Sequence, residues 1–189
     1  MNPIDQAILD FFTHYRVDSL VFVMLIITYT GSSLVVGGLT LLSAISFYIH
    51  KHTSNIIPLL ITIGGSTITT YLIKHIVDRA RPLGAIYTEL SPSFPSGHAT
   101  TAMALYGFMI YTIWSQSTKT SRDEHRSLHK FLTAGLVILI LLIGLSRLYL
   151  GVHYFSDVLV GFFIGLIWIL ISRSIAKSKF WRLLVGEHL

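Results

Sequence analysis

Two apolar runs, at residues 131–145 and 158–171, flank a short segment that holds all the charged groups of this part of the chain. Arg147 and Asp157 are the only Asp, Glu, Lys or Arg residues across both runs and the segment between them. A charge at membrane depth costs kilocalories unless it has a partner or a function. If the second helix starts before His153, that imidazole and Asp157 share one helix face. The segment is therefore either an ion pair that joins two helices or part of a polar site.

The composition places these runs in a membrane protein. The chain has 189 residues, of which 52% are hydrophobic and 12% charged, whereas about a quarter of the residues of soluble domains are charged. We predict one integral membrane domain over residues 1–189. Cysteine is absent, which excludes disulfides and cysteine–metal sites within this chain. The first 18 residues lack a basic start followed by a short apolar core, so no cleavable signal is predicted.

The fold class predicted from these runs is an all-α polytopic bundle. Five spans are expected, at residues 34–49, 56–73, 99–114, 131–145 and 158–171. Residues 19–30 are equally apolar, but a helix of about a dozen residues covers only ~18 Å of the ~30 Å hydrocarbon core. They form either a sixth, tilted span or a partly buried segment. Residues 1–15 have the amphipathic spacing of a helix that lies in the membrane interface.

Positive charge is concentrated in two segments, residues 119–130 and 173–182, which hold eight of the fourteen Lys and Arg residues. Both segments follow apolar spans, as cytoplasmic loops do under the positive-inside rule. The net charge of +5 is therefore not interpreted as a sign of nucleic-acid binding. The alternation of spans places three polar clusters together on the opposite, outer face, at residues 74–82, 95–98 and 147–157.

These clusters contain the groups that a phosphate pocket needs. Lys74, Arg81 and Arg147 are permanent cations, and the guanidinium fork matches phosphate oxygens two at a time. Ser96 is a predicted helix cap, and Gly97 offers an unshielded backbone amide beside it. A helix N-terminus of this kind favours anions. The sequence thus predicts a phosphate site at the membrane surface.

Two histidines, His98 and His153, are expected on the same face. One can attack phosphorus while the other protonates the departing oxygen, a division of roles that suits phosphoryl transfer. No metal site is predicted there, because the two carboxylates of the clusters, Asp78 and Asp157, form no acidic pair.

Each cluster alone has a simpler interpretation. Lys74 and Arg81 could extend to the headgroup region as ordinary interfacial side chains, and Ser96 could be only a helix cap. Asp78, four residues after Lys74, is interpreted as its structural partner, and Arg79 as an interfacial residue. The convergence of complementary groups on one face favours a single site over these separate explanations.

Taken together, the clusters resemble the three-part signature of the type 2 phosphatidic acid phosphatase superfamily. That group includes bacterial phosphatidylglycerophosphate and undecaprenyl diphosphate phosphatases, glucose-6-phosphatase and the soluble vanadium haloperoxidases. The resemblance covers about residues 56–171. The motifs, intact and in order, are Lys74-x6-Arg81-Pro82, Pro95-Ser96-Gly97-His98 and Ser146-Arg147-x5-His153-x3-Asp157.

The resemblance implies a role for each of these residues. His153 would be the nucleophile that forms a phosphohistidine, with Asp157 orienting it. His98 would be the acid for the leaving group and later the base for water. The phosphate would be held, without a metal or other cofactor, by Lys74, Arg81, Ser96, Gly97 and Arg147.

The expected function is dephosphorylation of a lipid phosphate or diphosphate at the outer face of the cell membrane. Resemblance to small bacterial members favours undecaprenyl diphosphate or phosphatidylglycerophosphate as substrate; no oligomeric state is predicted. A lipid phosphotransferase is the alternative among enzymes. A non-enzymatic lipid or anion transporter is less favoured, because the apolar runs hold few polar groups for a path. The loop at residues 83–94 is too short for a lid domain, so we expect an open site.

Overall fold

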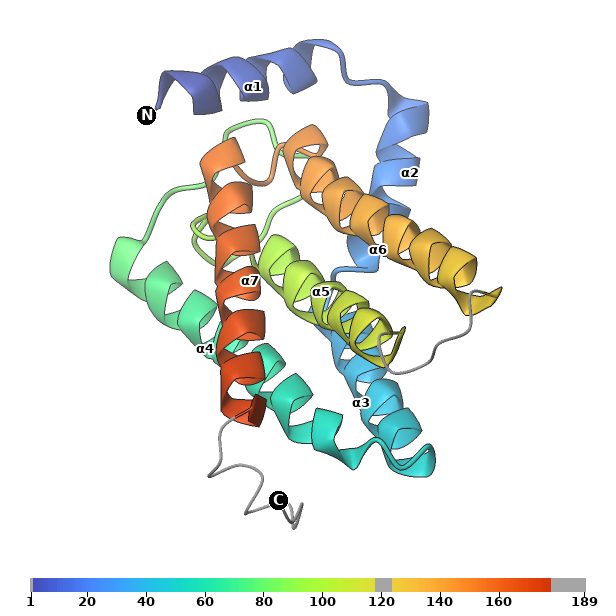
Figure 1. The fold of residues 1–189 in the computed structure, drawn as a ribbon. Helices are drawn as coiled ribbons and strands as arrows, with labels where there is room; N and C mark the ends of the chain where they lie inside the picture. Colours follow the sequence, from blue (N-terminus) through green and yellow to red (C-terminus); the bar gives the residue numbers. More distant parts are fainter. Residues whose placement is uncertain (1, 118–123, 178–189) are drawn as a thin grey trace.

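The computed structural model describes residues 2–117 and 124–177. These residues form seven α-helices and one 3-10 turn and no strand, which confirms the predicted all-α fold (Figure 1). The elements are α1 (Pro3–His14), α2 (Asp18–Tyr29), α3 (Ser33–Ile49), η1 (Thr53–Asn55), α4 (Ile56–Val77), α5 (Gly97–Ser117), α6 (Glu124–Tyr149) and α7 (Phe155–Lys177).

α5 lies at the centre of the bundle and contacts α4, α6 and α7 (Figure 1). Its approach to α7 depends on small residues. A Cβ added at Gly161 would lie 2.7 Å from the Ser96 carbonyl oxygen, and one added at Gly165 would lie 2.7 Å from the Met103 Cβ. Small residues let membrane helices pack backbone to backbone, so α7 is held directly against the first turns of α5.

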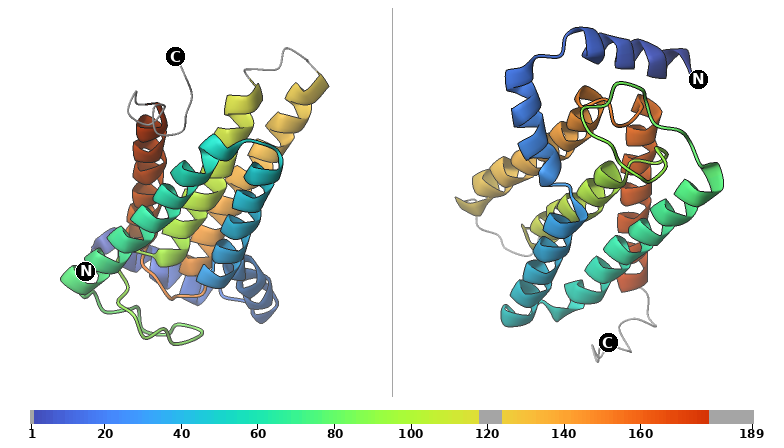
Figure 2. Two further views of the ribbon diagram at one scale, coloured as in Figure 1. Left: turned by 90° about the horizontal axis from the view of Figure 1, so that it is seen from below. Right: turned by 180° about the vertical axis from the view of Figure 1, so that it is seen from behind.

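Three helical stretches are long and apolar enough to cross a membrane alone, at Thr53–Val77, Arg126–Tyr149 and Phe155–Ala176. α2 and α3, bent by 41° at a short break, pass the same test together as one broken span. α5 is less apolar, because its buried positions include Ala and Thr, and it lies among the other helices of the bundle (Figure 2). By length and apolarity the described helices thus give three to four candidate spans; α5, 21 residues long, lies among them, which is compatible with the predicted five or six.

Residues 19–30 do not cross separately, because α3 continues the path that α2 begins (Figures 1 and 2). The backbone carbonyls at the break between them accept hydrogen bonds from side chains of the protein, as irregular backbone at membrane depth requires. The Tyr106 hydroxyl donates to the Thr30 carbonyl at 2.8 Å, and Thr101 Oγ1 donates to the Gly31 carbonyl at 3.1 Å. Gly31 is needed for close packing, since a Cβ there would lie 2.8 Å from Ile143 Cγ2.

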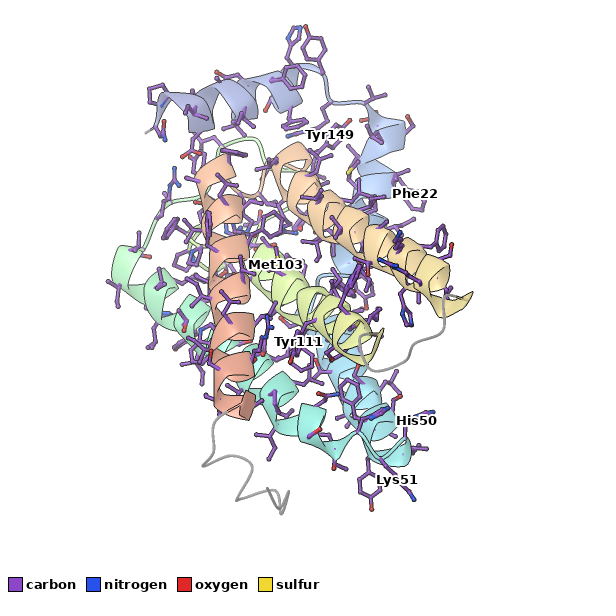
Figure 3. The ribbon with its side chains drawn as sticks, viewed as in Figure 1. Phe22, His50, Lys51, Met103, Tyr111 and Tyr149 are labelled. Atoms are coloured by element: carbon purple, nitrogen blue, oxygen red, sulfur yellow. The ribbon has the colours of Figure 1, made fainter. Side chains whose placement is uncertain are left out.

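α1 lies across one end of the bundle, next to the ends of α6 and α7 (Figure 1). Its exposed apolar side chains include Ile4 and Phe11, which is consistent with the predicted interfacial helix. Figure 3 places Tyr149 at this end and His50 and Lys51 at the opposite end.

The two basic segments, 119–130 and 173–182, lie partly outside the described residues. Their described parts, at the start of α6 and the end of α7, lie away from the end that α1 covers (Figures 1 and 2).

Candidate active site

The three polar clusters meet at the end of the bundle that carries α1, where the loops of residues 78–96 and 150–154 also lie (Figure 1). A cavity of about 290 Å³ is lined there by Lys74, Gly97, His98 and His153, among others. This volume is at the lower end of the range for ligand pockets. The cavity therefore suits a polar headgroup and not a whole lipid.

His153 is held by Asp157, although not on one helix face as predicted. α7 starts only at Phe155, so His153 lies in the turn before the helix. Its Nδ1 is 3.4 Å from Asp157 Oδ2, and both side chains are buried. The Tyr154 amide donates to the same carboxylate oxygen at 2.9 Å, and so does the Ser93 hydroxyl. These bonds fix the carboxylate that holds Nδ1 and leave Nε2 as the ring nitrogen that the carboxylate does not contact.

The environment keeps His153 neutral. Burial lowers the pKa of its imidazole to about 4, although the hydrogen bond with Asp157 opposes this effect. The nearby charges of Arg147 and Arg81 lower the pKa further. A neutral imidazole has a lone pair on Nε2, which lies 3.3 Å from Arg81 Nη1. His153 can therefore act as a nucleophile at neutral pH.

Of the three predicted cations, Lys74 lines this cavity, while Arg81 and Arg147 pair with Glu89, a residue of its lining. Lys74 also donates to the Pro92 carbonyl. Arg81 donates to the Val152 carbonyl at 2.8 Å. Arg147 is fully buried. The site thus concentrates positive charge next to two histidines.

Glu89, which the sequence analysis did not single out, neutralises part of this charge. Its carboxylate forms ion pairs with Arg81, at 2.6 Å, and with Arg147. Burial raises the pKa of the Glu89 carboxyl, but the charges of Arg147 and Arg81 outweigh burial and lower it to about 2. The loop at residues 83–94 is not a lid domain, yet it inserts the Glu89 side chain between Arg81 and Arg147. The site is therefore less open than we expected.

Ser96 and Gly97 begin α5 as predicted, but they face different surroundings. Ser96 is fully buried, its hydroxyl accepts from the Ala99 amide at 3.5 Å, and its own amide donates to the Asp157 carbonyl at 3.0 Å. Gly97 lines the cavity, and a Cβ there would meet open space. Of the two residues, Gly97 is the one that the structure places at the cavity.

Three interpretations of the charged residues are wrong. Arg147 does not pair with Asp157; it pairs with Glu89, and Asp157 pairs with Arg79, whose Nη1 lies 2.6 Å from Asp157 Oδ1. Arg79 is therefore part of the site and not an interfacial residue. Asp78 is not the partner of the Lys74 ammonium. It ends α4 in a left-handed conformation, and its amide donates to the carbonyl of Lys74.

Asp5 also belongs to this group of residues, through an ion pair with Arg79 at 2.8 Å. No local spacing signals this contact, because Asp5 is on α1 and its partner is 74 residues away. No cluster of three or more His, Cys, Asp or Glu side chains within residues 2–117 and 124–177 is arranged to hold a metal ion.

Comparison with known proteins identifies the family. The model of the PAP2 superfamily matches residues 55–181, which is more than half of the chain. The chain belongs to the PAP2 superfamily. It is 30% identical over 146 residues to phosphatidylglycerophosphatase B of Bacillus subtilis, across 77% of this chain and 70% of that protein. It is 27% identical to mouse dolichyldiphosphatase 1 over 121 residues, 60% of this chain and about half, 51%, of that relative.

Solved structures of PAP2 proteins have the same fold. The PAP2-type phosphatidylglycerolphosphate phosphatase of B. subtilis superposes with a TM-score of 0.81 at 27% identity, over 93% of this chain and 87% of that chain. Aquifex aeolicus LpxE superposes with a TM-score of 0.66 at 25% identity, over 89% of this chain and 94% of that chain. The chain is therefore a multi-pass membrane phosphatase of the PAP2 superfamily.

Proposed function

We propose that this PAP2 phosphatase hydrolyses the phosphate monoester or diphosphate of a membrane lipid through a phosphohistidine at His153. The observation that carries the proposal is the shared cavity, where a neutral His153, His98 and Lys74 line one space. A nucleophile, a proton donor and a cation are the three parts that phosphoryl transfer requires.

The reaction has two steps. In the first, His153 Nε2 attacks phosphorus, and the N–P bond forms as the P–O bond to the lipid breaks. His98 gives its proton to the departing oxygen. In the second, His98 takes a proton from water, whose oxygen bonds to phosphorus as the N–P bond to His153 Nε2 breaks, so that inorganic phosphate is released. Asp157 accepts the Nδ1–H hydrogen bond throughout and stabilises the positive charge that develops on the phosphorylated imidazole.

The phosphate oxygens replace Glu89 on its two arginines. Arg81 and Arg147 then bind the phosphate, together with Lys74 and the backbone amide of Gly97 at the start of α5; Ser96, predicted to take part, instead caps the helix, and its amide is bonded to the Asp157 carbonyl. The buried Nε of Arg147 has no hydrogen-bond partner among the described residues, so it is available to a phosphate oxygen. This set of donors can neutralise the phosphate with no metal ion, and we propose a metal-independent enzyme.

The lipid part of the bound substrate extends out of the cavity along α4. Thr67, Thr70 and Tyr71 of this helix line the cavity below Lys74, and Tyr71 is exposed at the bundle surface. The relatives named for phosphatidylglycerophosphate and dolichyl diphosphate support a glycerophospholipid phosphate or a polyprenyl diphosphate as substrate. The positive-inside rule supports an active site on the outer face of the cell membrane.

A phosphate-release assay with purified protein tests this proposal. The panel comprises phosphatidylglycerophosphate, undecaprenyl diphosphate, phosphatidic acid and soluble p-nitrophenyl phosphate. At least one lipid should be hydrolysed, and His153→Ala should lower kcat by about a thousand-fold or more. EDTA should leave the rate unchanged, and vanadate should inhibit as a mimic of the five-coordinate transition state. Activity in His153→Ala, or a loss with EDTA that a divalent cation restores, would refute the mechanism.

A further inference from the structure

α1 contributes one buried carboxylate to the site, although it lies outside the three motifs. Asp5 is 1% exposed and is the buried residue of α1. It accepts hydrogen bonds from the Ser156 amide at 2.8 Å, from the Ser156 hydroxyl at 2.7 Å and from Arg79 Nη2 at 2.8 Å. Burial raises the pKa of the Asp5 carboxyl, but the hydrogen bonds from Arg79 and Ser156 outweigh burial and lower it. Asp5 is thus a buried anion.

The guanidinium of Arg79 lies between two carboxylates. Nη2 contacts Asp5, while Nη1 contacts Asp157 Oδ1 at 2.6 Å, and the group stacks on the Tyr154 ring at 4.1 Å from its centroid. The other oxygen of Asp157 is the one that faces Nδ1 of His153. A continuous chain of contacts therefore runs from Asp5 through Arg79 and Asp157 to His153.

Negative and positive groups alternate along this series of contacts, from Asp5 to Arg79 to Asp157, and this alternation gives Asp5 a function. A cation that paired only with Asp157 would compete with the imidazole for the carboxylate's negative charge. Asp5 supplies a second anion to Arg79, so Asp157 retains more of its charge for His153. This matters most when Nε2 carries the phosphoryl group, because the imidazole is then positive and depends on Asp157 for stabilisation.

We propose that Asp5 is a positioning residue for the phosphatase reaction, which acts through Arg79 to keep the Asp157 carboxylate available to His153. The inference rests on the proposed role of His153 as nucleophile. It extends the active site to a helix that lies across the end of the bundle and outside the motif-bearing core. A purely structural alternative is that Asp5 only anchors α1, and the experiment separates the two.

The test is a double-mutant cycle on the full-length protein, with phosphatidylglycerophosphate in detergent micelles as substrate. Asp5→Asn keeps the shape of the side chain and removes its charge. With Arg79 present, this change should lower kcat by about ten-fold or more and leave KM within about two-fold, as for partners that orient a catalytic histidine. In the Arg79→Gln background the same change should lower kcat by less than about two-fold, because the competing cation is gone.

Asp10→Asn is the matched control. Asp10 is an exposed carboxylate on the same helix, and its side chain contacts Gln6 at 2.7 Å, so this variant should have wild-type kinetics. Unchanged kcat in Asp5→Asn, or equal losses with and without Arg79, would overturn the inference. Asp5→Asn and Asp5→Ser could also fail to fold when Arg79 is present and fold in the Arg79→Gln background. In that case the Asp5–Arg79 ion pair only anchors α1, and the positioning role is refuted. Activity in His153→Ala would instead refute the proposed function itself.

Discussion

His98 and His153 line the same cavity but have different chemical duties in the proposed reaction, and the leaving group distinguishes them. A general acid contributes about 10²- to 10⁴-fold when the departing oxygen needs a proton. We predict a loss of that size for His98→Ala with phosphatidic acid, whose leaving group is an alcohol. With p-nitrophenyl phosphate, whose leaving group is a stable anion, the loss should be less than about ten-fold. The measurement is kcat/KM for both substrates, and equal losses would contradict the assignment.

The ion pairs of Glu89 lead to a prediction about how vanadate changes the unfolding temperature. Arg147 is fully buried, so Glu89→Gln leaves it without its carboxylate, a change that costs about 3–5 kcal/mol for buried pairs. The unfolding temperature of the variant should be lower than that of the wild type. Vanadate should raise this temperature more in Glu89→Gln than in the wild type, because the oxyanion replaces the missing charge. An equal rise in both proteins would show that Glu89 does not occupy the oxyanion site.

The same ion pairs predict how this stability difference depends on pH. The pKa of Glu89 is about 2 in the folded protein, against an ordinary value of 4.5. A lowered pKa means that the carboxylate stabilises the fold above pH 4.5 and loses this effect as the pH falls toward 2. The difference in unfolding temperature between the wild type and Glu89→Gln should therefore narrow below about pH 4.5. A constant difference from pH 7 to pH 3 would contradict the low pKa.

The sequence predicted which residues surround the site better than it predicted their partners. Lys74, His98 and His153 reach one cavity because the motifs lie at helix ends that the alternation of spans brings to one face. Glu89 and Asp5 could not be found in this way. One lies in an irregular loop and the other on an interfacial helix, and neither position has a periodicity that fixes its contacts.

At the scale of helices, the glycines of α7 set the position of the first turn of α5. A Cβ at Gly161 would lie 2.7 Å from the Ser96 carbonyl oxygen and 3.0 Å from the Ala99 Cβ. Since the first neighbour is backbone, Gly161→Ala must displace the start of α5, on which Gly97 and His98 lie. We predict a destabilisation of about 1–3 kcal/mol together with a lower kcat, measured by thermal unfolding and phosphate release.

Gly135 provides the matched control for this substitution. It lies within α6, where an added Cβ would meet nothing within 4 Å. Gly135→Ala should therefore leave kcat unchanged and stabilise the helix by up to about 1 kcal/mol. If both alanine variants behaved alike, the packing of α7 on α5 would not determine the geometry of the site.

Helix length explains why one element could not be decided from sequence. A helix of about a dozen residues, at 19–30, is short for the hydrocarbon core, so its length is compatible with either a tilted span or a partly buried segment. The structure joins α2 to α3 through the break at Gly31. The sequence shows two apolar segments, but the hydroxyls of Thr101 and Tyr106 that satisfy the break come from α5.

For the whole molecule, the distribution of charge predicts that the active site faces outward. The chain has no cysteine, so single cysteines can report on sidedness in intact cells. Thr88, in the loop next to the site, and Ser54, at the opposite end of the bundle, are both exposed. A membrane-impermeant maleimide should label Thr88→Cys and spare Ser54→Cys. The reverse pattern would place the reaction in the cytoplasm.

The contacts of residues 5–17 join parts of the protein that are far apart in the sequence. Val17 donates from its amide to the Tyr149 hydroxyl at 2.8 Å, and Arg16 donates to the Tyr149 carbonyl at 3.1 Å. Asp5 reaches its place only against Ser156. These residues on and just after α1 therefore have their partners more than 130 residues further along the sequence. The part of the site that Asp5 contacts is therefore complete only when α7 is present, so a chain truncated before Ser156 should not dephosphorylate lipid.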